Sequence, residues 1–309
     1  MSVIATFSIN QFPILLGDLL LSSDHNSETS LNLPTIGEIT EIFPEGSGFI
    51  PIGLSQKVFV LNENLSLAWA GSKILAQGII AELLRECQKK PFWESRDLEQ
   101  FFRAFEAELD EVSILGYSNN GRGIFSFGFG RHESRDENEN YGRLKLAGTG
   151  ADDLKSHMNT FKPVLSGANP LENAVANTLW ITSKMIGQER VSAQNLLNYY
   201  GGGFEIVSLV RKQFRKIDDF LCLIWRGFQM KDLSWRLALP EIAIKYFYIQ
   251  DILLIKKIEL KNQKNGSLKA VNKSIYLISP IIKNQAQDGL QLKNIKLSSF
   301  NSSVLSTLK

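Results

Sequence analysis

Short apolar runs and alternating apolar and polar residues near the N-terminus indicate β-strands. We expect strands at residues 3–8, 12–21, 57–61 and 65–70, with the last two joined as a hairpin. Residues 22–55 are rich in Ser, Asn, Gly, Pro and Glu, which predicts a long loop or a small insertion. Asp18 falls inside the second apolar run, which is an unusual place for a charged side chain.

Apolar residues then recur at helical spacing in two separate groups. The first group predicts a helix at residues 72–88, with Ser72 as its N-cap, and a second helix from Asp97 onward. The second group predicts helices from Ala151, at residues 171–186 and at residues 192–200. Strands are expected at residues 112–117, 123–129, 143–147, 204–210 and 220–225. Residues 132–140 are charged and predict a solvated loop.

Helices in two groups, separated by hairpins, indicate two sheets that face each other with helices outside each. We therefore predict an α+β protein, a four-layer αββα sandwich, over residues 1–228 with an insertion at 22–55. After Gly227 the pattern predicts strands at residues 242–249, 252–260 and 274–282, with a turn at Asn265 and Gly266. Residues 229–309 are thus a β-rich extension, and the polar composition of its final stretch, 285–309, predicts weak order.

Composition narrows the class of protein. The chain has 309 residues, of which 44% are hydrophobic and 21% are charged, an ordinary globular composition. Its three histidines are scattered, and its two cysteines, Cys87 and Cys222, have no metal-type spacing, so we expect no metal and no cofactor. The cysteines are interpreted as inert core residues. The N-terminus lacks a basic segment, and no apolar run reaches about 18 residues, so we expect a cytoplasmic protein without a membrane partner.

Charge is unevenly distributed along the chain. Residues 229–309 carry 13 Lys and Arg against 5 Asp and Glu, a net charge of +8, whereas the whole chain has a net charge of +2. The part of the chain before this extension therefore carries a net charge of −6. This asymmetry favours a separate tail or an anionic contact. Nucleic acid is the disfavoured partner, because the tail has no compact run of Lys and Arg.

The N-terminus offers a nucleophile that needs no histidine. Met1 is followed by the small residue Ser2, so we expect removal of Met1 and exposure of the Ser2 amine. A free α-amine has a pKa of about 7.7–8 and can act as general base for the hydroxyl of its own residue. Many proteins begin with Met and Ser, however, so this feature alone does not indicate an enzyme.

Three further residues complete a candidate site. Asp18 can lie beside Ser2 across one hairpin, Lys57 opens the next strand, and Gly71 sits where a strand turns into a helix. The backbone N–H of Gly71 is a candidate oxyanion donor. Each residue also has a structural interpretation: Asp18 as an ion-pair residue, Lys57 as an edge-strand charge, and Gly71 as a turn.

Together these segments resemble the proteasome β-subunit and the bacterial proteasome-like ATP-dependent peptidase. The similarity covers roughly residues 2–228, and its anchors are residues 2–18, 56–58 and 67–72, the turn at 147–150 and the stretch 198–203. By this resemblance Ser2 takes the place of the family's N-terminal threonine nucleophile, Asp18 and Lys57 tune it, and Gly71 supplies the oxyanion N–H. Thr149 then lies in the family's Gly-Ser-Gly turn.

Two positions depart from the family pattern. Asn198 stands where the family has aspartate, and Gly201 stands where it has serine. Asparagine carries no charge and glycine offers no hydroxyl, so the N-terminal amine would be held less firmly.

The resemblance implies an N-terminal-nucleophile amidohydrolase that cleaves peptide or amide substrates, forms a homo-oligomer and works with an ATPase partner. Two alternatives stay open. One is a catalytically silent member of the fold that acts as a scaffold or ring-forming subunit. The other is a protein that binds an anionic partner through its basic tail.

Overall fold

The computed structural model describes residues 2–24, 31–39, 49–138, 140–165, 169–229, 235–263 and 267–282. In these residues the chain forms a mixed α/β protein with five α-helices and a 3₁₀ turn at Glu108–Asp110. The helices are α1 (Lys73–Lys89), α2 (Ser95–Arg103), α3 (Ala151–Thr160), α4 (Pro170–Ser192) and α5 (Gln194–Leu197).

The largest sheet is antiparallel, has six strands and contains the N-terminal strand. In spatial order its strands are β11 (Glu133–Asn138), β12 (Gly142–Ala147), β1 (Ile4–Ile9), β2 (Phe12–Asp18), β13 (Phe204–Val210) and β14 (Gln213–Lys216). Helix α4 packs on β1, β2 and β13, because its apolar stripe, with Ile181 and Met185, buries against Phe7 and Leu16. This sheet carries Asp18 at the end of β2.

A second antiparallel sheet has four strands and carries Gly71. Its spatial order is β10 (Ile124–Phe129), β9 (Val112–Asn119), β8 (Leu65–Gly71) and β7 (Val58–Asn62). Helices α1 and α2 cover one face, where Ile79, Leu83 and Phe102 pack against Trp69. The other face meets the six-stranded sheet through a separate apolar cluster that includes Ile4, Leu15, Ala68, Leu115 and Val207.

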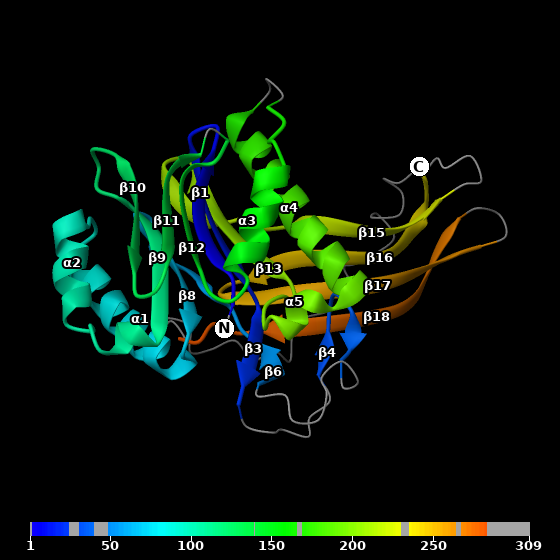
Figure 1. Cartoon of the computed structure of the whole chain (residues 1–309), viewed down its shortest axis with the longest axis horizontal. Helices are drawn as coiled ribbons and strands as arrows, with labels where there is room; N and C mark the ends of the chain where they lie inside the picture. The colour runs from blue at the N-terminus through cyan, green and yellow to red at the C-terminus, as the bar shows by residue number, and fades with distance from the viewer. Residues whose placement is uncertain are drawn as a thin grey trace.

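The C-terminal strands form a third antiparallel sheet, at the opposite end of the molecule from α1 and α2 (Figure 1). Its strands are β15 (Phe220–Gln229), β16 (Trp235–Ile249), β17 (Ile252–Asn262) and β18 (Leu268–Ile278). One face buries Cys222, Ile244, Tyr246 and Ile255 against Leu19, next to the end of β2. β15 runs through residue 228, so this sheet begins before the composition changes.

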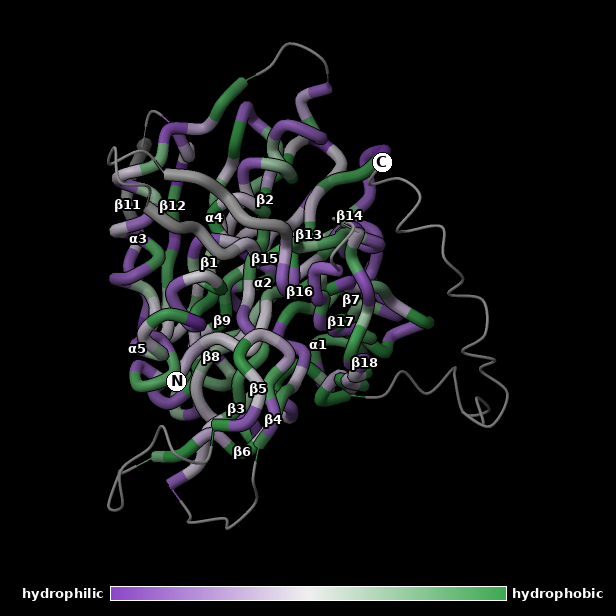
Figure 2. The backbone as a smooth tube through the Cα atoms, turned by 90° about the vertical axis from the view of Figure 1, so that its right-hand side faces the viewer, coloured by the Kyte–Doolittle hydropathy of each residue, from purple (hydrophilic) through white to green (hydrophobic). Residues whose placement is uncertain are grey.

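The insertion is partly structured. It contributes β3 (Leu20–Ser23) paired with β6 (Ile50–Leu54), and a short pair of β4 (Asn32–Leu33) with β5 (Gly37–Glu38). Figure 2 and Figure 1 both place these four strands together at one end of the molecule. The insertion packs where α4 ends and α5 begins. There, Leu196 of α5 buries against Leu20 of β3 and against the insertion residues Leu33 and Ile39.

Several predicted boundaries are wrong. The apolar run at 12–21 forms two strands separated at Leu19, whose N–H donates to the carbonyl of Gly201 at 3.2 Å. Residues 133–138 form the edge strand β11 instead of a loop, since an edge strand tolerates charged residues. β14 was not expected at all, α4 extends past Ile186 to Ser192, and the predicted helix at 192–200 shortens to α5.

Other predictions differ in finer detail. Ser72 occupies the N-cap position of α1, yet its side chain makes no capping hydrogen bond. Instead of two sheets, the described strands divide among five. The predicted turn at Asn265 and Gly266 and the stretch 285–309 lie outside the described residues. In the described part of the chain, no helix combines the length and the apolarity needed to cross a membrane.

Candidate functional site

Asp18 and Lys57 form a buried ion pair where the two large sheets meet. Asp18 ends β2, and Lys57 immediately precedes β7. The Lys57 Nζ lies 2.7 Å from Asp18 Oδ1 and also donates to the carbonyl of Leu20 at 2.5 Å. Both side chains have no exposed surface. Burial lowers the pKa of the Lys57 ammonium, and the nearby carboxylates of Asp18 and Glu205 oppose that shift.

The carboxylate of Asp18 also organises three backbone segments. Its Oδ1 accepts from the N–H of Val3 at 3.0 Å, and its Oδ2 accepts from the N–H groups of Gly201 at 2.9 Å and Leu20 at 3.2 Å. Asp18 therefore ties the N-terminal strand to the segment that follows α5. Hydrogen bonds from several N–H groups and from one ammonium offset the free-energy cost of burying this carboxylate.

Ser2 lies next to this pair and is fully buried. Its backbone nitrogen donates to Thr149 Oγ1 at 3.3 Å, and its carbonyl accepts from the N–H of Gly150 at 3.0 Å. Thr149 Oγ1 in turn donates to the backbone carbonyl of Asn198 at 2.5 Å. The turn at residues 148–150 thus holds the backbone of Ser2, while Asp18 holds that of Val3.

The predicted supporting residues Asn198 and Gly201 take part through their backbones. The side-chain amide of Asn198 donates to Asp153 Oδ2 at 3.0 Å, which also accepts from the Tyr200 hydroxyl at 2.9 Å. Gly201 has φ +131°, and an added Cβ would lie 2.2 Å from Glu189 Oε2. A serine side chain at this position is therefore disfavoured by backbone conformation and by the neighbouring carboxylate.

Gly71 lines a surface cavity of about 660 Å³. It ends β8 with φ +105°, where an added Cβ would lie 2.1 Å from the carbonyl of Glu111. The same cavity is lined by Gly148 and Thr149, which hold Ser2, and by Arg131 and His132. The cavity therefore brings the predicted oxyanion residue and the Ser2 turn to one opening.

Two buried carboxylates were missed by the sequence interpretation. Glu189 of α4 accepts from Thr35 Oγ1, from Asn195 Nδ2 at 2.7 Å and from the N–H of Gly202 at 3.0 Å. Burial raises the pKa of Glu189 to about 6, and these hydrogen bonds oppose the shift. Glu205 of β13 is 1% exposed and accepts from the N–H of Lys57 at 2.7 Å. The sequence did contain a signal for both residues, namely a charged residue at a position that the apolar pattern predicts to be buried. Glu189 lies on the buried face of α4, and Glu205 lies between Phe204 and Ile206 in β13.

No family model and no curated protein matches the sequence. Among solved structures, the chain is similar to the crystal structure of eukaryotic HslV from Trypanosoma brucei, with 12% identity and a TM-score of 0.37. That similarity covers 67% of this chain and 98% of the other. At this TM-score the function has to be argued from the site itself.

In the described part of the chain, no group of three or more His, Cys, Asp or Glu side chains is arranged to hold a metal ion. The polar groups that the candidate site brings together are the ion pair of Asp18 and Lys57, Ser2 and the backbone donors.

Proposed function

We propose that the chain is an N-terminal-nucleophile amidohydrolase of the proteasome-like type, in which Ser2 attacks an amide bond after Met1 has been removed. The observation that carries this proposal is the double role of Asp18 Oδ1. The same oxygen accepts from Lys57 Nζ at 2.7 Å and from the N–H of Val3 at 3.0 Å. The buried ammonium of Lys57 is therefore connected to the peptide between Ser2 and Val3 by two hydrogen bonds that share one oxygen of Asp18.

The proposed reaction uses Ser2, Lys57, Gly71 and one water molecule. The free amine of Ser2 takes the proton of its own hydroxyl, and the oxygen attacks the substrate carbonyl carbon. The N–H of Gly71 stabilises the resulting oxyanion, and the Lys57 cation favours the developing negative charge on the Ser2 oxygen. The amide C–N bond then breaks, and the leaving nitrogen takes the proton from the Ser2 ammonium. Water, deprotonated by the same amine, hydrolyses the ester and regenerates Ser2.

The remaining parts of the proposal come from the sequence pattern and, for the assembly and the ATPase partner, from the family resemblance. They are the αββα arrangement of the four layers, the division into residues 1–228 and 229–309, a homo-oligomeric assembly, an ATPase partner and a cytoplasmic location. The packing of helices on the outer faces of the two large sheets supports the layer arrangement.

A second candidate is a catalytically silent member of the same fold. Asn198 directs its side-chain amide to Asp153, and Gly201 contributes only its backbone N–H to Asp18. Neither residue therefore brings a carboxylate or a hydroxyl to the Ser2 amine. This arrangement favours a role in which the fold is kept for assembly and not for chemistry.

Hydrolysis of fluorogenic peptide amides separates the two candidates. The wild-type chain is expected to release the fluorophore, and Ser2→Ala is expected to lose about 100-fold or more, because the attacking oxygen is gone while the small second residue is retained. Ser72→Ala is the matched control, since the Ser72 side chain makes no capping hydrogen bond. Equal rates for wild type and Ser2→Ala would overturn the hydrolase and leave the silent fold.

A further inference from the structure

Glu205 holds the backbone from which the Lys57 side chain departs. Its Oε2 accepts from the N–H of Lys57 at 2.7 Å and from the N–H of Val58 at 3.2 Å. Glu205 lies on β13, opposite Gly17 of β2, and so belongs to the six-stranded sheet, whereas Val58 begins β7 of the other large sheet. The Glu205 carboxylate therefore connects the two large sheets at Lys57, whose ammonium is the cation of the candidate site.

The second oxygen of Glu205 faces the C-terminal sheet. Its Oε1 accepts from Lys216 Nζ at 2.7 Å and from the hydroxyl of Tyr248 at 2.9 Å. Tyr248 lies on β16, and the ammonium of Lys216 lies 4.7 Å from the centre of its ring. One buried carboxylate therefore contacts the C-terminal sheet with one oxygen and the backbone of Lys57 with the other.

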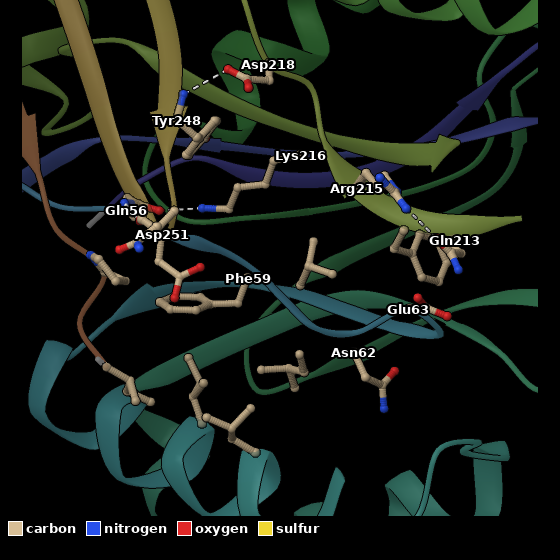
Figure 3. A pocket seen from close by; sticks show the side chains of 18 residues that line it. Gln56, Phe59, Asn62, Glu63, Gln213, Arg215, Lys216, Asp218, Tyr248 and Asp251 are labelled. Carbon is tan, nitrogen blue, oxygen red and sulfur yellow. Dashed lines mark hydrogen bonds between the residues drawn. The ribbon is translucent and has the colours of Figure 1, made fainter. Parts of the chain in front are cut away.

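Gln56 makes a second connection directly before Lys57. Its side-chain amide donates to the carbonyls of Asp251 at 2.5 Å and Ile278 at 2.7 Å, and its Oε1 accepts from Lys216 Nζ. Its backbone N–H donates to the carbonyl of Ser279 at 3.4 Å. Figure 3 shows Gln56, Lys216, Tyr248 and Asp251 gathered at one end of a cavity of about 560 Å³. Gln56 is therefore attached directly to the C-terminal segment, whereas Lys57 and Val58 reach it through Glu205.

We propose that Glu205 and Gln56 are positioning residues through which the C-terminal sheet, and Tyr248 in particular, fixes the place of the Lys57 ammonium at the catalytic site. This inference rests on the proposed function for its catalytic consequence. It gives the C-terminal extension a role within its own chain: residues 235–282 complete the support of Lys57.

The physical basis is the cost of a misplaced buried charge. Lys57 keeps its charge without solvent because Asp18 and the carbonyl of Leu20 lie within hydrogen-bond reach of its Nζ. A small shift of the Lys57 backbone lengthens these bonds, and errors of about 1 Å in a positioned group can cost about 100-fold in rate. The Glu205 charge also raises the pKa of Lys57, opposing the effect of burial.

The test compares two tyrosines of the same sheet in the full-length chain. Tyr248→Phe removes the hydroxyl that contacts Glu205, whereas the control Tyr276→Phe removes a hydroxyl that donates to Asn32 Oδ1 at 2.7 Å, within the insertion. We expect Tyr248→Phe to lower kcat for peptide hydrolysis about 10-fold with KM unchanged, because substrate contacts are retained. Tyr276→Phe is expected to keep the wild-type kcat. If the wild-type chain hydrolyses peptides, equal kcat values in the two variants would overturn the inference.

Glu205→Gln allows a measurement, the pH–rate profile, that would not change if Glu205 had only a structural role. Loss of the Glu205 charge lowers the pKa of Lys57 further, so Lys57 loses its proton at a lower pH. The alkaline limb of the pH–rate profile is therefore expected to shift to lower pH in Glu205→Gln. An unchanged alkaline limb in a folded Glu205→Gln protein would contradict the inference.

A spectroscopic measurement separates this inference from the hydrolase proposal. In protein labelled with ¹⁵N-lysine, the amide resonance of Lys57 reports its hydrogen bond to Glu205. We expect this resonance to move in Tyr248→Phe and to stay in place in Tyr276→Phe, whether or not the chain hydrolyses peptides. A wild-type chain without peptidase activity but with this resonance shift would reject the hydrolase and keep the coupling. A Lys57 resonance unmoved by Tyr248→Phe would reject the coupling.

Discussion

Lys57 Nζ lies 2.7 Å from Asp18 Oδ1, and neither side chain has exposed surface. Removing one partner of such a pair leaves an uncompensated charge in a site without solvent. The pair is also the link between the N-terminal strand and the segment before β7. Its integrity is therefore expected to control both the stability of the fold and the chemistry proposed for Ser2.

Asp18→Asn is expected to lower the free energy of unfolding by about 3–5 kcal/mol, because Lys57 loses its counter-charge. The change is measured by urea denaturation at neutral pH. Asp152→Asn is the matched control: Asp152 is 92% exposed and lies 4.0 Å from Lys155, so its loss should have little effect. A stability of Asp18→Asn equal to that of the control would contradict the importance of the buried pair.

Gly201→Ser tests why a glycine is needed at this position. The new side chain would meet Glu189 Oε2 at a position where φ is +131°, so we expect a loss of roughly 2 kcal/mol or more in unfolding free energy. In the double variant Gly201→Ser/Glu189→Ala the loss should be smaller than the sum of the two single losses, since the clash with Glu189 is removed while the contact with Asn195 Nδ2 and the positive φ remain.

The control for that series is Gly187→Ser in α4. An added Cβ at Gly187 meets no atom within 4 Å, and serine is a better helix former than glycine, so a slight gain in stability is expected. Strictly additive losses in the Gly201 and Glu189 double-variant cycle would show that the two residues do not interfere.

Glu189 should make stability depend on pH in the mildly acidic range. Burial raises its pKa from 4.5 to about 6 in the folded chain, so the folded state binds the proton more tightly than the unfolded state. The stability contributed by protonation is complete below pH 4.5 and is lost as pH rises through about 6, a change of about 2 kcal/mol.

Glu189→Gln cannot titrate, so urea denaturation at pH 4.5 and pH 6.5 gives a direct comparison. The difference in unfolding free energy between the variant and the wild type should move by about 1.5 kcal/mol in favour of the variant between these two pH values. The same difference at both pH values would show that Glu189 does not titrate in this window.

The order of strands and helices could be predicted from the periodicity of apolar residues, because the residues that form the buried face of one helix or strand lie close together in the sequence. Helix α1 was predicted from a stripe that includes Ile79 and Leu83, and the hairpin of β7 and β8 from its flanking runs. The edge strands β11 and β14 could not be found in this way. An edge strand is defined by the neighbour it pairs with, and its own residues can be charged.

The candidate site was predicted in part for a similar reason. Asp18 could be predicted as a site residue because it is a charged residue within an apolar run. The structure brings it to Lys57, beside Ser2. Glu189 and Glu205 were missed because their partners come from remote segments: Thr35 lies in the insertion and Tyr248 in the C-terminal sheet. Contacts between segments that lie far apart along the chain leave no local pattern in one sequence.

Both cysteines should be unreactive in the folded chain. Burial raises the pKa of the Cys87 thiol to about 12 and also raises the pKa of Cys222, so little thiolate forms at pH 8. Labelling with an aromatic disulfide reagent is expected to be slow in the native protein and fast in urea. Rapid labelling of either thiol without denaturant would contradict the packing of that residue.

The most direct test of the central proposal is tandem mass spectrometry of the N-terminal peptide after the protein has reacted with a peptidyl ester. The ester acylates the nucleophile, acid added during turnover stops hydrolysis of the acyl-enzyme, and the peptide identifies the residue that carries the added mass. The account predicts that Met1 is absent and that the acyl group is attached to Ser2. An N-terminal peptide that retains Met1, or that carries no acyl group on Ser2, would contradict it.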